Sequence, residues 1–192
     1  MNFIIGIDGG GSKTMGRIQD IAGQQEFTLS TSACTLSGDF EQCFAVLCDL
    51  IEKLLVKVGA SDQQTVVALG LAGAGKKQLA ATMQQRLVEH LPVNSVVIVE
   101  DCETALLGVK TVAKSVTFGL VSLGTGSFFA KQSAQQTTYV GGWGFPIGDD
   151  CSGAAIGFAA VQNFLHYLDD CHWQNRSISE DNGLNQPLYQ HL

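Results

Sequence analysis

Basic residues are scarce in this chain. Only 11 of its 192 residues are Lys or Arg, against 18 Asp and Glu, which gives a net charge of −7. Because nucleic-acid binding draws much of its affinity from clustered Lys and Arg, we expect no nucleic-acid partner. A phosphorylated ligand would have to be held by backbone amides and a metal ion.

Long apolar runs and paired cysteine motifs are also missing. No stretch approaches the ~20 apolar residues of a membrane span, and the N-terminus lacks the basic region of a signal peptide. We therefore expect a cytoplasmic protein without a membrane partner. The six cysteines form no C-x-x-C pair, and we expect reduced thiols at positions 34, 43, 48, 102, 151 and 171.

Short β-branched runs alternate with helical periods in the first part of the chain, and this predicts an α/β fold of the order βββαβαβ. The expected strands cover 3–7, 15–19, 26–30, 65–71 and 95–99, and the expected helices cover 39–58, 76–90 and about 104–112. Asp39 is a plausible N-cap of the long helix, and Gly59 would end it.

A second strand, glycine turn and returning strand follow at 116–123, 124–126 and 127–131. This recurrence suggests an internal duplication, with domains at 1–114 and 115–192, the second incomplete. A glycine-rich loop at 141–150 and an apolar helix at about 152–168 come next.

The first glycine turn combines a carboxylate with glycines and hydroxyls, in Asp8, Gly9, Gly10, Gly11, Ser12, Lys13 and Thr14. A carboxylate at a strand end can hold Mg²⁺ through water, and glycines let the backbone approach phosphate oxygens. The spacing is neither that of a P-loop nor that of a dinucleotide-binding turn. A plain hairpin with a glycine turn is the alternative.

The second turn repeats the pattern, and a carboxylate lies between the two. Gly124, Thr125, Gly126 and Ser127 again join glycine to hydroxyl donors, so the two turns would clamp one polyphosphate. Asp101 ends the fifth expected strand and begins a helix. It is either an N-cap or a general base, and ligands of α/β sheets gather beyond strand carboxyl ends.

These motifs, with the loop at 141–150, resemble the N-acetylglucosamine kinase group, also called the BadF/BadG/BcrA/BcrD-type ATPases, of the actin, hexokinase and heat-shock chaperone superfamily. The resemblance covers essentially the whole chain. It implies a ribonuclease H-like α/β fold of the actin and hexokinase type, with an N-terminal βββαβα lobe at 1–114 and the start of a second lobe at 115–192.

The resemblance also implies roles for individual residues. ATP would be held by residues 8–14 and 124–127, with Mg²⁺ at Asp8 and Asp101 as the catalytic base. The sugar would be held by Cys34, Asp101, Gly142, Trp143, Gly144 and Asp149. For Trp143 alone, a core aromatic is the alternative.

Three departures from the family pattern stand out. Cys34 occupies a position where the family usually has Asn, and Asp150 one where Glu is common. The chain also ends before the adenosine-binding glycine motif and the closing helix that the resemblance implies.

The resemblance implies a kinase that transfers the γ-phosphate of MgATP to glucosamine or N-acetylglucosamine, with a homodimer as one option. An activating ATPase of the 2-hydroxyacyl-CoA dehydratase or benzoyl-CoA reductase type is one alternative. A non-catalytic remnant that binds sugar or phosphate is the other. Because of the early end, we expect weak or no kinase activity from this chain alone.

Overall fold

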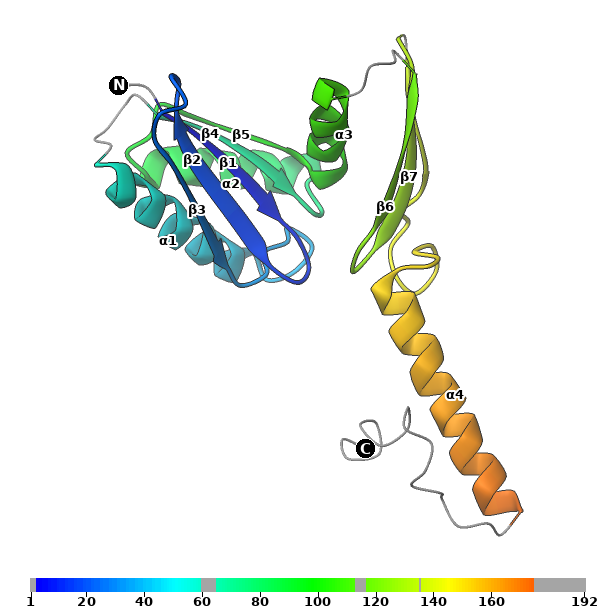
Figure 1. Ribbon diagram of the computed structural model, residues 1–192. Helices are drawn as coiled ribbons and strands as arrows, with labels where there is room; N and C mark the ends of the chain where they lie inside the picture. Colours follow the sequence, from blue (N-terminus) through cyan, green and yellow to red (C-terminus); the bar gives the residue numbers. More distant parts are fainter. Residues whose placement is uncertain (1–2, 60–64, 113–116, 135, 175–192) are drawn as a thin grey trace. The chain divides into compact units, whose positions relative to one another are not determined.

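The computed structural model describes residues 3–59, 65–112, 117–134 and 136–174. The chain divides into two compact units, Met1–Lys114 (unit 1) and Ser115–Leu192 (unit 2). Figure 1 traces both along the sequence. Within the described parts, no helix is both long and apolar enough to cross a membrane.

Unit 1 is built on a five-stranded mixed sheet of the order β3-β2-β1-β4-β5. Its strands are β1 (Phe3–Gly9), β2 (Thr14–Asp20), β3 (Glu26–Thr31), β4 (Thr65–Leu71) and β5 (Ser95–Glu100). The first three strands form an antiparallel meander, whereas β1, β4 and β5 run parallel. The carboxyl ends of these three parallel strands therefore lie at one edge of the sheet.

Helices α1 (Phe40–Val58) and α2 (Lys77–His90) cover one face of this sheet (Figure 1). Alternate residues of β1 point into the core beneath them, and Ile5 is fully buried. A Cβ on Gly16 would lie 2.9 Å from the Leu54 side chain, so this glycine lets α1 approach β2 closely. Apolar side chains of α1 complete the core, among them Leu47, Leu50, Ile51, Leu54 and Leu55.

Both predicted ends of α1 are confirmed. The Asp39 carboxylate accepts a hydrogen bond from the Gln42 N–H at 3.0 Å, which is the bond expected of an N-cap. Gly59 ends the helix in the left-handed conformation, with φ at 62°.

Helix α3 (Asp101–Val112) packs on the opposite face of the sheet. Gly70 of β4 has no room for a Cβ, because the Thr104 hydroxyl would lie 2.3 Å from it. The prediction that this helix begins near residue 104 is wrong, because β5 continues directly into α3 without a loop. The predicted βββαβα order of the lobe is confirmed from β1 to α2, and β5 and α3 follow it.

Unit 2 contains an antiparallel sheet of β6 (Phe118–Leu123), β7 (Ser127–Gln132) and β8 (Thr137–Gly141), followed by α4 (Gly153–Trp173). The predicted hairpin around residues 124–126 is confirmed by the pairing of β6 with β7. Residue 116, the predicted start of its first strand, lies outside the described residues. The sequence did not predict β8, and α4 continues past the expected end at residue 168.

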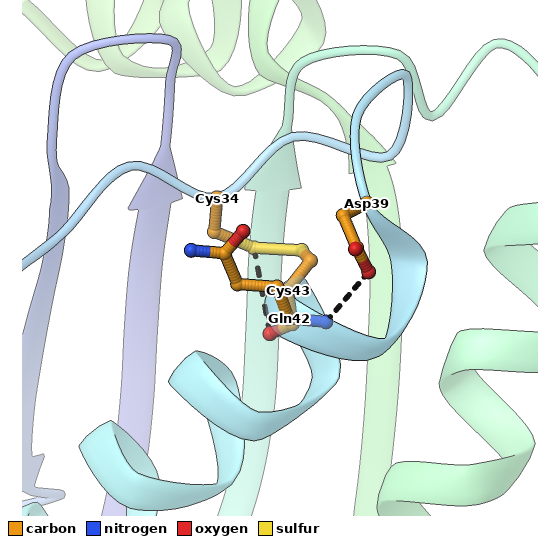
Figure 2. Close-up of a disulfide and its surroundings, with 4 residues drawn as sticks. All are labelled: Cys34, Asp39, Gln42 and Cys43. Atoms are coloured by element: carbon orange, nitrogen blue, oxygen red, sulfur yellow. Dashed lines mark hydrogen bonds between the residues drawn. A yellow bond between two sulfur atoms is a disulfide. The ribbon is translucent and has the colours of Figure 1, made fainter.

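Cys34 and Cys43 form a disulfide, with their Cα atoms 4.8 Å apart (Figure 2). The expectation of reduced thiols is therefore wrong for these two residues. The reason is tertiary: the segment between β3 and α1 folds back onto the first turn of α1, which brings the two side chains together. The other four cysteines keep reduced thiols, at positions 48, 102, 151 and 171.

Candidate functional site

Two carboxylates lie at the carboxyl edge of the parallel strands. Asp8 lies near the end of β1, opposite Gly70 of β4, and Asp101 follows Glu100 at the end of β5. In this register, Asp8 and Gly70 face the side of the sheet that α3 covers, because α3 packs directly on Gly70. The negative charge of Asp8 also raises the pKa of Asp101, so the two carboxylates lie within electrostatic range of each other.

The pKa of Asp101 lies above its ordinary value. Burial is the largest cause, because it disfavours the charged carboxylate. A hydrogen bond from the Cys102 N–H, 2.9 Å from Oδ1, lowers the pKa, whereas the charges of Asp8 and Glu100 raise it. A carboxylate whose pKa is moved toward neutrality is better matched to general-base catalysis.

The N-cap alternative for Asp101 fits less well. Asp101 is the first residue of α3, and its carboxylate accepts a bond from the residue immediately after it. An N-cap side chain usually accepts from the second or third helical N–H, as Asp39 does in α1. The Asp101 side chain therefore does not make the hydrogen bond that is usual for an N-cap.

The first glycine turn joins β1 and β2 at the same edge. It is closed by a bond from the Gly10 N–H to the Lys13 carbonyl at 3.1 Å. Residues 11–13 are exposed, so their backbone is accessible to a ligand. Gly9 cannot be replaced easily, because a Cβ there would lie 2.5 Å from Leu71 Cδ2.

Thr14 lies at the base of this turn with its side chain fully buried, and its hydroxyl has no hydrogen-bond partner. Thr14 pairs with Gly9, one residue beyond Asp8, so the side chains of Thr14 and Asp8 leave opposite faces of the sheet. The phosphate contact expected of Thr14 remains a prediction. An orphaned buried hydroxyl beside the turn is compatible with a polar ligand there.

The backbone of Cys34 lies beside the glycine turn. Its carbonyl oxygen is 3.1 Å from the position that a Cβ on Gly9 would take. Its side chain is buried and bonded to Cys43, so in this state the sulfur is not available to contact a sugar.

In unit 2, the second glycine turn is hydrogen-bonded to the N-terminus of α4. The carbonyls of Gly124 and Thr125 accept bonds from the N–H groups of Gly153 and Ala154, at 2.8 and 3.2 Å. The Ser127 hydroxyl donates to the Asp150 carbonyl at 2.7 Å. The turn and the glycine-rich loop at 141–150 are thus one connected structure.

The glycine-rich loop brings several predicted sugar-binding residues together. Asp149 Oδ1 accepts a bond from the Gly144 N–H at 3.1 Å, and a Cβ on Gly126 would lie 2.8 Å from Asp149 Oδ2. Trp143 is 85% exposed, so the alternative of a core aromatic does not hold within unit 2.

An open pocket of about 530 Å³ lies beside Trp143. It is lined by Tyr139, Val140, Gly141, Gly142 and Trp143, from β8 and the loop that follows. Gly142 and Gly144 have φ values of 71° and 90°, a backbone conformation that residues other than glycine rarely adopt.

Comparison with known proteins assigns the family. The model of the BadF/BadG/BcrA/BcrD ATPase family matches residues 5–181. The chain belongs to this family. Its predicted fold class is also confirmed, because solved structures of this fold superpose on the chain.

Two curated relatives are each 30% identical to this BadF/BadG/BcrA/BcrD family member. One is the N-acetylmuramic acid/N-acetylglucosamine kinase of Clostridium acetobutylicum, aligned over 172 residues and 88% of this chain. The other is the glucosamine kinase of Vibrio cholerae, aligned over 169 residues and 86% of this chain. The chain spans 55% of the length of each relative.

Two solved structures are similar to the whole or most of the chain. A provisionally named N-acetylglucosamine kinase from Chromobacterium violaceum is 26% identical, with a TM-score of 0.79 over 100% of this chain and 64% of that one. A ROK hexokinase from Thermus thermophilus is 17% identical, with a TM-score of 0.52 over 77% of this chain and 50% of that one. The second likeness concerns the fold alone.

The predicted site residues of this family member thus fall into two groups. Unit 1 brings together Asp8, Asp101 and the first glycine turn, and unit 2 brings together the second turn and the Trp143 loop. The clamp expected between the two turns would join the units, and it remains a prediction. Sequence reasoning gave no role to Glu100, whose charge contributes to the raised pKa of Asp101. Its place at a strand end was the available signal.

The residues at the carboxyl edge are compatible with Mg²⁺. In the described residues, no group of three or more His, Cys, Asp or Glu side chains could hold a metal ion. Mg²⁺ usually keeps several waters and binds through one or two carboxylates plus substrate phosphates. Asp8, close to Asp101 and beside the exposed turn, has the chemistry of such a ligand.

Proposed function

We propose that this chain carries the phosphate-binding and catalytic part of an amino-sugar kinase, which transfers the γ-phosphate of MgATP to a sugar hydroxyl. The observation that carries the proposal is the placement of Asp8 and Asp101 at one edge of the sheet, within electrostatic range of each other and beside an exposed glycine turn. The names of both curated relatives, which are kinases of amino-sugars, support the same chemistry.

Asp101 is the proposed general base. Its carboxylate would accept the proton of the acceptor hydroxyl as the oxygen attacks the phosphate. Its raised pKa, caused first by burial and then by the charges of Asp8 and Glu100, favours proton transfer near neutral pH. The hydrogen bond from the Cys102 N–H orients the carboxylate.

The remaining roles are positioning. The backbone of residues 9–13 would hold the phosphates, assisted by Ser12 and Lys13, and Asp8 would hold Mg²⁺ through water. Bound Mg²⁺ would neutralise charge on the phosphates. In unit 2, Thr125 and its neighbours would contact phosphate, while Gly142, Trp143, Gly144 and Asp149 would bind the amino-sugar. The activating-ATPase alternative is not favoured, given the kinase names of the relatives.

The test is a coupled ADP-release assay with glucosamine, N-acetylglucosamine and N-acetylmuramic acid, with mass detection of the sugar phosphate. Asp101→Asn should lower kcat by about 10²- to 10⁴-fold, the usual contribution of a general base. Glu103→Gln is the matched control, because Glu103 is exposed on the same helix. It should leave kcat nearly unchanged.

Two results would contradict the proposal. If no sugar produces ADP and a phosphorylated product, the non-catalytic alternative applies to this chain. If Asp101→Asn retains full activity, the base is another residue.

A further inference from the structure

The segment of residues 34–38, between β3 and α1, lies directly against the carboxyl edge of unit 1. The Leu36 N–H donates to the Ala72 carbonyl at 2.9 Å, and the Ala72 N–H donates to the Gly9 carbonyl at 3.0 Å. Two consecutive backbone bonds therefore connect the 34–38 segment to the residue that begins the glycine turn.

Contacts between the 34–38 segment and its neighbours are too close for added side chains. A Cβ on Gly9 would lie 3.1 Å from the Cys34 carbonyl oxygen, and a Cβ on Gly73 would lie 2.5 Å from Ser37 Oγ. Since packed backbone has little free volume, a displacement of the 34–38 segment would also shift the backbone of Gly9. Asp8 is the adjacent residue.

The disulfide anchors the start of this segment to a rigid helix. Cys34 is bonded to Cys43 in the first turn of α1, and both are 2% exposed. Figure 2 shows Asp39 beside the disulfide, where its carboxylate accepts the Gln42 N–H and fixes the same helical turn. Further along α1, Leu47 is fully buried in the core. The disulfide is thus a covalent cross-link, in addition to the main chain, between the core helix and the segment that touches Gly9.

We propose that the Cys34–Cys43 disulfide is a reversible redox switch that controls how firmly the 34–38 segment holds the end of β1. Closed, it fixes the backbone next to Asp8 and the glycine turn. Opened, it frees the segment from this cross-link and weakens binding of MgATP, whose proposed ligands are Asp8 and the glycine turn. The effect on MgATP rests on the proposed kinase function, whereas the effect on the segment does not.

The chemistry is thiol–disulfide exchange with a small dithiol. One thiolate of the reductant attacks a protein sulfur and forms a mixed disulfide, which the second thiol of the reductant then resolves. The protein gains two electrons and two protons as two thiols, and the dithiol leaves as a cyclic disulfide. Because both cysteines are buried, attack requires local opening of the segment.

The second cysteine of α1, Cys48, does not compete. Burial raises the pKa of the Cys48 thiol to about 11, with a further increase from the charge of Glu52. The thiolate is the attacking species, so Cys48 stays protonated and inert near neutral pH. Exchange is therefore confined to the Cys34–Cys43 pair within α1 and the 34–38 segment.

The first experiment measures the switch without any variant. Alkylation and mass spectrometry should count four thiols before treatment with dithiothreitol and six after it, matching the four cysteines outside the disulfide and the six of the sequence. Amide hydrogen exchange at Leu36 and Ala72 should become faster on reduction and recover on reoxidation. Unchanged exchange in fully reduced protein would overturn the proposal.

The second experiment measures the functional consequence. Reduction should raise KM for MgATP by about tenfold, a typical size for coupling between sites, with kcat within about threefold. The double variant Cys34→Ala/Cys43→Ala should resemble the reduced protein and ignore dithiothreitol. Cys151→Ser, which keeps the disulfide, should retain the response to reduction.

The two proposals fail in different ways. If no sugar is phosphorylated in either redox state, the kinase function is wrong and hydrogen exchange still decides the switch. If phosphorylation occurs with the same KM in both states, the functional part of the redox proposal is wrong and the kinase function stands. A double variant that does not fold leaves the comparison of oxidised and reduced wild-type protein as the deciding measurement.

Discussion

The two units bury their apolar side chains to very different degrees. In unit 1, Ile5, Leu47, Ile51 and Leu69 are fully buried, and they belong to one continuous core between the sheet and helices α1 and α2. In the described part of unit 2, large apolar side chains are exposed, including Val140 at 64%, Ile147 at 89%, Ile156 at 63% and Trp173 at 89%.

Helix α4 accounts for much of this difference. Apolar residues surround most of its circumference, a pattern typical of helices buried in the interior of a domain. Among its described residues, Phe164 and Cys171 are buried, whereas Ile156 and Phe158 are exposed. Unit 1 therefore has its own stabilising core, and the stability of unit 2 depends far less on burial within its described residues.

The largest expected difference between the units comes from matched isoleucine truncations. Ile51→Ala in α1 should cost about 2–5 kcal/mol, because it leaves a cavity in a packed core. Ile156→Ala in α4 should change stability by less than about 0.5 kcal/mol, since its side chain is largely exposed. Urea unfolding followed by hydrogen exchange mass spectrometry reads each unit separately. Equal costs would mean that α4 is buried in solution.

The next effect tests the close approach of α1 to the sheet. Gly16→Ala should cost about 1–3 kcal/mol, because the new methyl would collide with Leu50 and Leu54. Gly6→Ala is the control on the neighbouring strand, where a Cβ would meet nothing within 4 Å. The control should be neutral or slightly stabilising in the same urea experiment. A tolerated Gly16→Ala would show that α1 can shift and that the unit 1 core is less rigid than its packing indicates.

Helix caps allow the same comparison with smaller effects. Asp39 caps α1, and Ser152 caps α4 through a bond from the Ala155 N–H at 3.0 Å. Each change to Ala should cost about 1 kcal/mol of local helix stability. Faster hydrogen exchange in the first turn of the affected helix is the measurement. If Ser152→Ala changes nothing, the turn at Gly124, which also accepts bonds from α4, is the dominant cap.

Much of unit 1 could be predicted from the sequence because its signals are local. The helical period of α1 lies between Asp39 and Gly59, whose cap chemistry fixes both ends. The apolar run of β4 gave its bounds correctly at 65–71. The parallel order of the strands then places Asp8 and Asp101 at one edge, which the sequence also indicated.

Features that depend on tertiary contacts could not be predicted. Nothing in a separation of nine residues signals the Cys34–Cys43 bond, which needs the chain to fold back onto α1. Strand β8 is short and largely exposed, without an alternation of buried and exposed residues, and it gains its structure by pairing with β7. The early start of α3 follows from the direct passage out of β5, which periodicity alone does not reveal.

The smallest effect concerns Asp101, which is only half-buried. Its folded-state pKa is raised by burial, the Cys102 N–H opposes this, and the charges of Asp8 and Glu100 add to the increase. A raised carboxyl pKa means that ionisation near pH 7 destabilises the folded state, and this cost disappears as the pH falls through the folded pKa. Asp101→Asn should thus raise the urea midpoint at about pH 7 while lowering kcat by about 10²- to 10⁴-fold.

The same variant should lose its advantage over wild type below the ordinary Asp pKa of about 3.9, where both states of the wild-type protein bind the proton. Glu103→Gln should show no comparable gain, because Glu103 is exposed on the same helix. Urea midpoints at three pH values test both statements. A loss of stability at neutral pH in Asp101→Asn would mean that the bond from the Cys102 N–H outweighs burial. The ionised Asp101 carboxylate would then stabilise the fold, which is the opposite of what its raised pKa predicts.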